Sequence, residues 1–291
     1  MKWSREGFPP FAPKRSFIET LFGRYTLADG GHKQRPSERD EGPFGFVYRL
    51  GAIALLSVHT FRMLLSARTD RGDTLRVAHR FTNGSASFII ISMAFVGMIM
   101  VYQSTMQLTR SIGDTQLVGA SFLKLLVRLV GPVVVGLLIA CRVGAGIAAE
   151  IGAMAVTDQL DAFRMCNAEP VEVLMVPRLR GGILASLILV LIGASASAVA
   201  GALCGEVLFG MSPGVYWNFE LIGFPDLCQG LIKALLFGAA VPIVSGVCGL
   251  AALGGARGVG EATTDAVVGS SFVIVVLDSL VSLVFHVTVG Q

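Results

Sequence analysis

The stretch from Phe81 to Thr109 contains no charged residue. A helix of about 20 apolar residues crosses the ~30 Å hydrocarbon core of a bilayer, so this stretch is long enough to span a membrane with some tilt. The rest of the chain has the same character, because only 15% of its 291 residues are charged and its mean hydropathy is +0.70. In a soluble domain about a quarter of the residues are charged. The sequence therefore predicts an integral membrane protein.

Five stretches are predicted to cross the membrane, which makes the expected fold all-α. The predicted spans cover residues of about 81–109, 125–148, 181–205, 227–253 and 265–289. Residues 44–67 mix apolar side chains with arginines, and they predict a helix lying in the interface with its arginines reaching the headgroups. Residues 1–43 are polar, basic and proline-bearing, and predict a disordered cytosolic tail.

The basic residues before Arg80 predict the orientation of these spans. Short segments rich in Lys and Arg stay on the cytosolic side, so the N-terminus is expected in the cytosol. Five spans then place the connection between the second and third spans, and the turn over 254–264, in the cytosol. Residues 110–124, 206–226 and the C-terminus fall on the outer side. The net charge of +3 comes largely from the first eighty residues, so it indicates orientation and not nucleic-acid binding.

The connection between the second and third spans is longer than a turn requires, and it is acidic where the positive-inside bias favours basic residues. Asp158 and Asp161 share one face if this segment is helical. We predict a helix over about 153–165 that docks on a cytosolic partner. The expected contact residues are Thr157, Asp158, Gln159, Asp161 and Phe163. The alternative is an ordinary solvated helix between two spans.

Charged residues inside the predicted spans need partners. An unpaired charge at the bilayer centre costs at least ~2.5–3.5 kcal/mol. Lys233 and Asp278 are therefore predicted to face each other, or to share a polar cavity with Arg128. Three roles stay open for them: shaping the outer end of a substrate path, forming a structural ion pair, or coupling to protons. Arg142 and Glu150, about two turns apart in the second span, predict a structural clamp near the cytosolic end.

The chain shows no pattern of an enzyme. The glycines of residues 144–149 lie inside an apolar helix with no preceding strand, which excludes a dinucleotide fingerprint. Residues 255–261 lack the Lys-Ser/Thr of a phosphate-binding loop, so this chain is not expected to bind ATP. Neither a metal-ligand spacing nor a nucleophile–base set is visible. We therefore expect no cofactor or metal in this chain.

Four motifs of this chain resemble the MlaE/YrbE permease family, the membrane subunits of MCE-type ABC lipid transporters. The motifs are LVRLVGPVV at 126–134, RVGAGIAAEIGAM at 142–154, TDQLDA at 157–162 and VPR at 176–178. The resemblance runs from about Phe44 to the C-terminus. It departs from the family at Leu129, where the family usually has a glutamate.

The resemblance implies a homodimer in a bacterial inner membrane, with the helix over 44–67 as an elbow helix and the segment over 153–165 as the coupling helix. It implies a pair of cytosolic ABC ATPases that carry ATP and Mg, an MCE-domain protein on the periplasmic side, and often a small STAS-domain protein. The implied activity is phospholipid transport between inner and outer membranes, which maintains outer-membrane lipid asymmetry.

The first span offers methionines, which adapt to irregular acyl chains, together with a few amides. We expect the residues nearest the dimer axis, and so nearest the lipid, to be Gln103, Met106, Gln107 and Leu108. The alternative is that these side chains only pack or face lipid. Two rival functions also stay open: a proton-coupled secondary transporter of a lipid or hydrophobic solute that uses Lys233 and Asp278, and a membrane enzyme acting on lipids.

Overall fold

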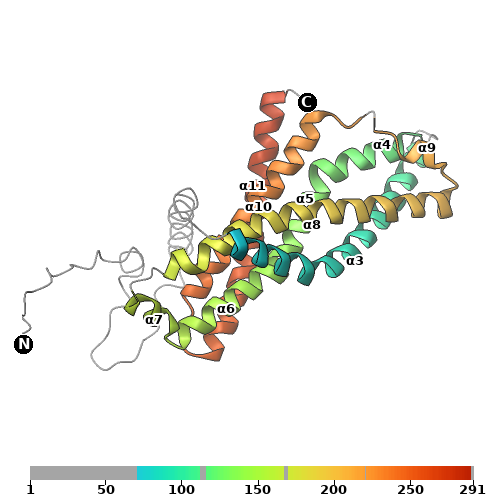
Figure 1. The fold of residues 1–291 in the computed structure, drawn as a ribbon. Coiled ribbons are helices and arrows are strands. Elements are labelled where there is room, and N and C mark those ends of the chain that lie inside the picture. Colours follow the sequence, from blue (N-terminus) through green and yellow to red (C-terminus); the bar gives the residue numbers. More distant parts are fainter. Residues whose placement is uncertain (1–70, 112–115, 167–169, 220, 290–291) are drawn as a thin grey trace, which may run out of the picture. The chain divides into compact units, whose positions relative to one another are not determined.

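The structure, a computed structural model, describes residues 71–289 except 112–115, 167–169 and 220 (Figure 1). The predicted tail over 1–43 and the predicted elbow helix over 44–67 lie outside the described residues. Within them, every regular element is helical. The elements are α3 (Arg71–Ser111), α4 (Gln116–Leu125), η2 (Leu126–Val130), α5 (Gly131–Ile139), η3 (Ala140–Gly144), α6 (Ala145–Val156), α7 (Gln159–Met165), α8 (Pro170–Phe209), α9 (Pro213–Tyr216), α10 (Phe224–Leu250) and α11 (Ala256–Val289).

Five segments of the described chain are long and apolar enough to cross a membrane, at the places that the sequence predicts. They cover residues 72–108, 118–156, 173–209, 224–250 and 256–288. Most ends extend beyond the predicted limits, because hydropathy marks only the part of a helix inside the hydrocarbon. The third span, for example, was predicted to begin at Gly181, but its helix α8 begins at Pro170 and continues through Pro177.

The second span is one helical rod built from α4, η2, α5, η3 and α6, in which η2 and η3 are π-helical turns. A π-turn bonds each N–H to the carbonyl five residues back, which widens the helix locally. In η2 this bond joins the N–H of Gly131 to the carbonyl of Leu126. A side chain at Gly131 would meet that carbonyl oxygen at 2.7 Å, so glycine permits the wide turn.

Helices α3 and α8 form one packed group, α11 and the second span form another, and α10 contacts both groups. Helix α3 lies along α8, while α10 contacts α11, α8 and the second span (Figure 1). The contact between α3 and α8 is close because Gly97 sits directly against the backbone of Ser197, where no side chain would fit. Small residues at a helix interface permit such a close approach of two backbones. Helix α10 is the most buried of the five spans, since 61% of its apolar 18-residue stretch is buried inside the protein.

A sharp corner joins the second span to α7. Helix α6 ends at Val156, and Asp158 adopts a left-handed backbone conformation with φ of 57°, which Asp tolerates better than most residues. The expected coupling helix over 153–165 is therefore divided: residues 153–156 finish α6, and a separate helix α7 covers Gln159–Met165. Helical periodicity is continuous across this point, so the sequence pattern does not mark the corner.

Tyr216, in α9, fastens the connection between the third and fourth spans. Its side chain is buried, and its hydroxyl donates to the carbonyl of Ala198 at 2.9 Å. Gly119 and Gly201 make room for it, since a side chain at either would meet Tyr216 at about 2.5–2.6 Å. Burial, with a smaller contribution from Cys204, raises the pKa of Tyr216.

Candidate functional site

Lys233 is the centre of a buried polar cluster between α10, α11 and η2. Its side chain is 0% exposed, and its Nζ lies 2.6 Å from Oδ1 of Asp278. The same ammonium donates to Oγ of Ser282 at 2.9 Å and to the backbone carbonyl of Arg128 at 3.2 Å. The predicted contact between Lys233 and Asp278 is thus confirmed. Arg128 joins this contact through its carbonyl and not through its guanidinium.

The carbonyl of Arg128 can accept this bond because it has no α-helical donor. In an α-helix the carbonyl of residue i is taken by the N–H of residue i+4, and the residue four positions after Arg128 is Pro132, which has no N–H. Helix α10 also approaches the turn closely: a side chain at Gly230 would meet the carbonyl oxygen of Val127 at 2.5 Å. The wide turn and the glycine together bring the Lys233 stem within reach of the second span.

A second layer of charge surrounds this centre. Asp226 is buried and lies 3.6 Å from Nη1 of Arg128 and 3.9 Å from Nζ of Lys124. It also accepts a bond of 3.0 Å from the N–H of Gly223, at the start of α10. Gln229 donates to Oγ of Ser282 at 3.4 Å. We call this set the outer network, after the side on which the predicted topology places it: Lys124, Arg128, Asp226, Gln229, Lys233, Asp278 and Ser282.

Four members of the outer network were not predicted from the sequence: Lys124, Asp226, Gln229 and Ser282. A usable signal was present in their spacing. Asp226, Gln229 and Lys233 stand at i, i+3 and i+7 on one face of α10, and Ser282 follows Asp278 by one turn of α11. A polar stripe at helical spacing within an apolar span indicates a buried network.

The geometry of Lys233 favours a fixed ion pair over a proton relay. The ammonium of Lys233 donates hydrogen bonds to Ser282 and to the Arg128 carbonyl, and it forms an ion pair with Asp278. These partners come from α11 and η2, so the buried lysine links both to α10. The network is therefore suited to holding the outer part of α10 and α11 to the second span.

The residues of the first span that are predicted to lie near the dimer axis and to bind the transported lipid are not part of this network. Gln103 and Gln107 are exposed on α3, and Met106 and Leu108 are half-buried. Helix α3 packs along α8, whereas the outer network joins α10 and α11 to the second span. The structure of one chain does not bring the two sets together, and their joint role in binding lipid stays a prediction.

The predicted partner contacts gather at the corner between α6 and α7. Thr157, Asp158 and Gln159 are exposed, and Phe163 is half-buried. Asp161 belongs to α7. The hydroxyl of Thr157 donates to the carbonyl of Ala153 at 2.8 Å, which closes the last turn of α6. The short helix α7 thus follows directly after a closed end of the second span.

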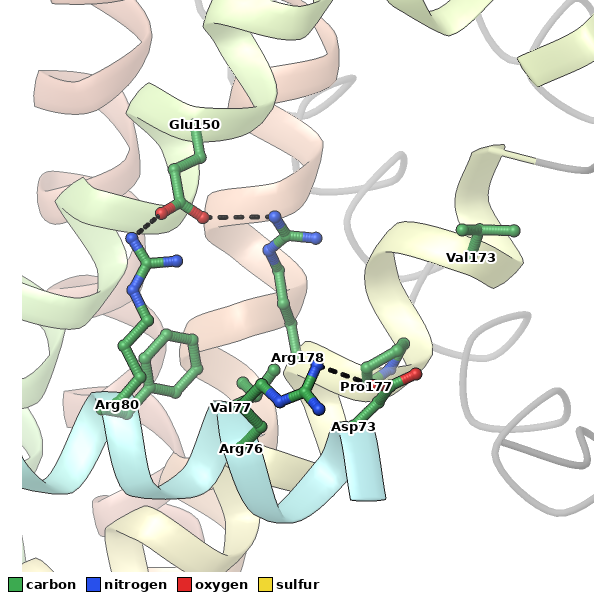
Figure 2. A pocket seen from close by; sticks show the side chains of 9 residues that line it. Asp73, Arg76, Val77, Arg80, Glu150, Val173, Pro177 and Arg178 are labelled. Carbon is green, nitrogen blue, oxygen red and sulfur yellow. Dashed lines mark hydrogen bonds and ion pairs between the residues drawn. The ribbon is translucent and has the colours of Figure 1, made fainter. Parts of the chain in front are cut away.

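Glu150 forms a clamp between three helices, and Arg142 makes a separate contact. Figure 2 shows its carboxylate between Arg80 of α3 and Arg178 of α8; it forms an ion pair with Arg80 and lies 3.2 Å from Nη2 of Arg178. Arg142 instead donates through Nε to the carbonyl of Gly84 at 2.9 Å. Arg142 and Glu150 therefore each join the second span to α3, but they do so through separate contacts. Eight residues separate them, about 12 Å along a helix, and Arg142 lies in the wide turn η3, which changes its direction.

Comparison with known proteins places these features in a family context. A family model described as Permease MlaE matches residues 74–284, which include the whole outer network and the corner at α7. A probable ABC transporter permease protein of Synechocystis sp. is 34% identical over 80% of this chain and 89% of its own length. One of Rickettsia typhi is 36% identical over 70% and 80%. Protein TRIGALACTOSYLDIACYLGLYCEROL 1, chloroplastic, of Arabidopsis thaliana is 28% identical over 88% and 75%.

Proposed function

This chain belongs to the MlaE permease family, and from that premise we propose that it moves phospholipids between the inner and outer membranes of a bacterium. In this proposal it sits in the inner membrane with its N-terminus in the cytosol, and its transport maintains outer-membrane lipid asymmetry. One relative is named after a galactolipid, which supports a lipid as the substrate class.

The proposed working unit has two copies of this chain and a pair of cytosolic ABC ATPases that bind ATP and Mg. An MCE-domain protein on the periplasmic side receives or supplies the lipid, and a small STAS-domain protein binds beside the ATPase. The two copies would bring their first spans together, with Gln103, Met106, Gln107 and Leu108 near the shared axis. The lipid would lie between them, below the outer network.

The observation that carries the mechanism is the continuous helical rod that runs from α6 to the outer network. Helix α7 follows α6 after the corner at Thr157 and Asp158, and α6 continues through η3 and α5 to η2. At η2, the Arg128 carbonyl is bound by Lys233. A displacement of α7 by the ATPases would therefore reach α10 and α11 through one rod.

The docking step is tested by reversing the charge of the corner. We expect the double variant Asp158→Lys/Asp161→Lys to lose co-purification with the ATPase and ATP-dependent lipid transfer between vesicles. Glu261→Lys is the matched control, since Glu261 is an exposed acid on the same side of the predicted topology. If the double variant assembles and couples as the wild type does, α7 is not the docking element.

A proton-coupled carrier is the rival function, and the same vesicles separate the two. Our proposal expects lipid transfer to require ATP and the partner ATPase, and to be insensitive to a pH gradient. Transfer by the purified chain alone, driven by a pH gradient, would support the rival and exclude an ABC mechanism.

A further inference from the structure

A cavity of about 230 Å³ opens between α3, α6 and α8 (Figure 2), near the end of α6 that leads to α7. Its lining combines three arginines with two acids and four apolar side chains. The charged residues are Asp73, Arg76 and Arg80 of α3, Glu150 of α6 and Arg178 of α8. Three positive charges against two negative ones leave the cavity with a net charge of +1. We call it the arginine pocket.

Arg76 is the guanidinium of the arginine pocket that is best placed to bind a ligand. Arg80 and Arg178 are held by Glu150, and Arg178 also donates to the carbonyl of Leu174 at 2.8 Å. Arg76 lies 3.6 Å from Asp73, which is longer than a hydrogen bond, and its side chain is 83% exposed. A guanidinium presents a planar set of five N–H donors that matches a phosphate in two-pronged geometry.

The remaining lining restricts the class of ligand. Asp73 lies beside Arg76, so a group that carries an ammonium next to its phosphate meets both signs of charge. Val77, Val173 and Pro177 add an apolar wall, and Val173 is exposed. A small soluble anion has no apolar surface to bury against this wall, whereas the glycerol and first acyl carbons of a lipid would pack against it.

The level of the arginine pocket fits a lipid as well. The charge-free apolar stretches of α3 and α8 begin at Phe81 and Gly181, so Arg76 and Val173 lie about one and two turns before the apolar parts of two spans. Lipid headgroups lie at this level, and arginines there bind them while their stems stay against apolar surface.

We propose that the arginine pocket binds the headgroup of a zwitterionic phospholipid such as phosphatidylethanolamine, with the phosphate on Arg76 and the ammonium near Asp73. This site is separate from the outer network and lies at the opposite end of the second span. It provides a place where a lipid of the leaflet on the α7 side is held before or after transport.

Photo-crosslinking in nanodiscs tests the proposal. The full chain would be incorporated with a phosphatidylethanolamine that carries a diazirine near its headgroup, and crosslinked peptides would be mapped by mass spectrometry. We expect crosslinks on the peptides that contain Arg76 and Val173. Arg76→Ala should reduce them about tenfold, the effect of losing one strong charge-assisted hydrogen bond.

Arg257→Ala is the matched control, because Arg257 is also 83% exposed and also pairs with an acid one turn away, but lies outside the arginine pocket. It should leave the crosslinks unchanged. Val173→Glu, which adds a negative charge at the apolar wall, should reduce them without touching an arginine. Equal crosslinking in wild type, Arg76→Ala and Val173→Glu would overturn the proposal.

Two further probes distinguish the source of the phosphate. A diazirine-bearing diacylglycerol, which lacks the phosphate, should crosslink weakly at these peptides, and inorganic phosphate at millimolar concentration should not displace the phospholipid. Equal labelling by diacylglycerol, or displacement by inorganic phosphate, would exclude a phospholipid site. No ATPase is present in this assay, so its failure would leave the transport proposal untouched.

Discussion

The ammonium of Lys233 lies 2.6 Å from the carboxylate of Asp278, and the lysine side chain is fully buried. Removing one partner of a buried ion pair is strongly destabilising, whereas replacing both by apolar groups of similar size is often neutral. We expect Lys233→Met to lower the free energy of unfolding by about 3 kcal/mol. Lys233→Met/Asp278→Leu should recover most of it. Thermal unfolding of the detergent-purified chain measures both.

The Lys233→Met/Asp278→Leu variant also separates a structural role of these two charges from a role in lipid transport. Arg257→Met serves as the control, because Arg257 is exposed and its loss should change stability by less than about 0.5 kcal/mol. A Lys233→Met protein as stable as the wild type would contradict the network as a structural link. A stable double variant that no longer transfers lipid would show that the charges also act in transport.

The clamp at Glu150 makes a second prediction. Glu150→Gln removes the charge between Arg80 and Arg178 and leaves Arg178, only 14% exposed, without its carboxylate. The free energy of unfolding should fall by about 1–3 kcal/mol. Glu261→Gln, in an exposed pair with Arg257, should change it by less than about 0.5 kcal/mol. Similar melting temperatures for the two variants would show that Glu150 does not bind the three helices together.

The buried hydroxyl of Tyr216 predicts a response to pH. Tyr216→Phe should lower stability by about 1 kcal/mol near neutral pH, because the carbonyl of Ala198 loses its donor. Burial raises the pKa of Tyr216 above the ordinary value of about 10, so above that pH the unfolded state releases its proton more readily than the folded state. The wild type should therefore lose stability as the pH rises past 10, and Tyr216→Phe should lose less. Parallel melting curves between pH 8 and 11 would contradict the assignment.

The contact at Gly97 predicts that two glycines of the same helix respond in opposite ways. Gly97→Ala forces a methyl group against the carbonyl oxygen of Ser197, and should destabilise the chain by about 1–3 kcal/mol. Gly84→Ala meets nothing within 4 Å and should be neutral or stabilising by up to about 1 kcal/mol, since alanine favours a helix. Melting temperatures decide the point, and a tolerated Gly97→Ala would mean that α3 and α8 pack less closely.

The sequence predicts the spans and the meeting of Lys233 with Asp278 because both follow from one physical rule, the high cost of charge in hydrocarbon. That rule acts on each residue separately and needs no knowledge of how the helices turn. The partner of Arg142 depends on such knowledge. The wide turn η3 sets the direction of its side chain, and the amino-acid pattern contains no sign of a π-turn there.

The corner at Asp158 was missed for a similar reason. An aspartate in a left-handed conformation resembles any helical aspartate in the sequence, so the pattern favours one helix over 153–165. Asp226 and Gln229 differ from the corner, because their spacing with Lys233 places all three on one face of a helix and can be read from the sequence. Polar residues at i, i+3 and i+7 within an apolar span deserve the same weight as a charged pair.

The two wide turns give the second span a property that an ordinary transmembrane helix lacks. Each π-turn stores one extra residue, and tightening it to α-helical geometry would slide the neighbouring segment by roughly 1.5 Å. One of these turns, η2, contains the Arg128 carbonyl that binds Lys233, and the other, η3, contains Arg142. Tightening either turn would therefore change the length of the rod between the contacts of Lys233 and Arg142, a change that a regular α-helix does not permit.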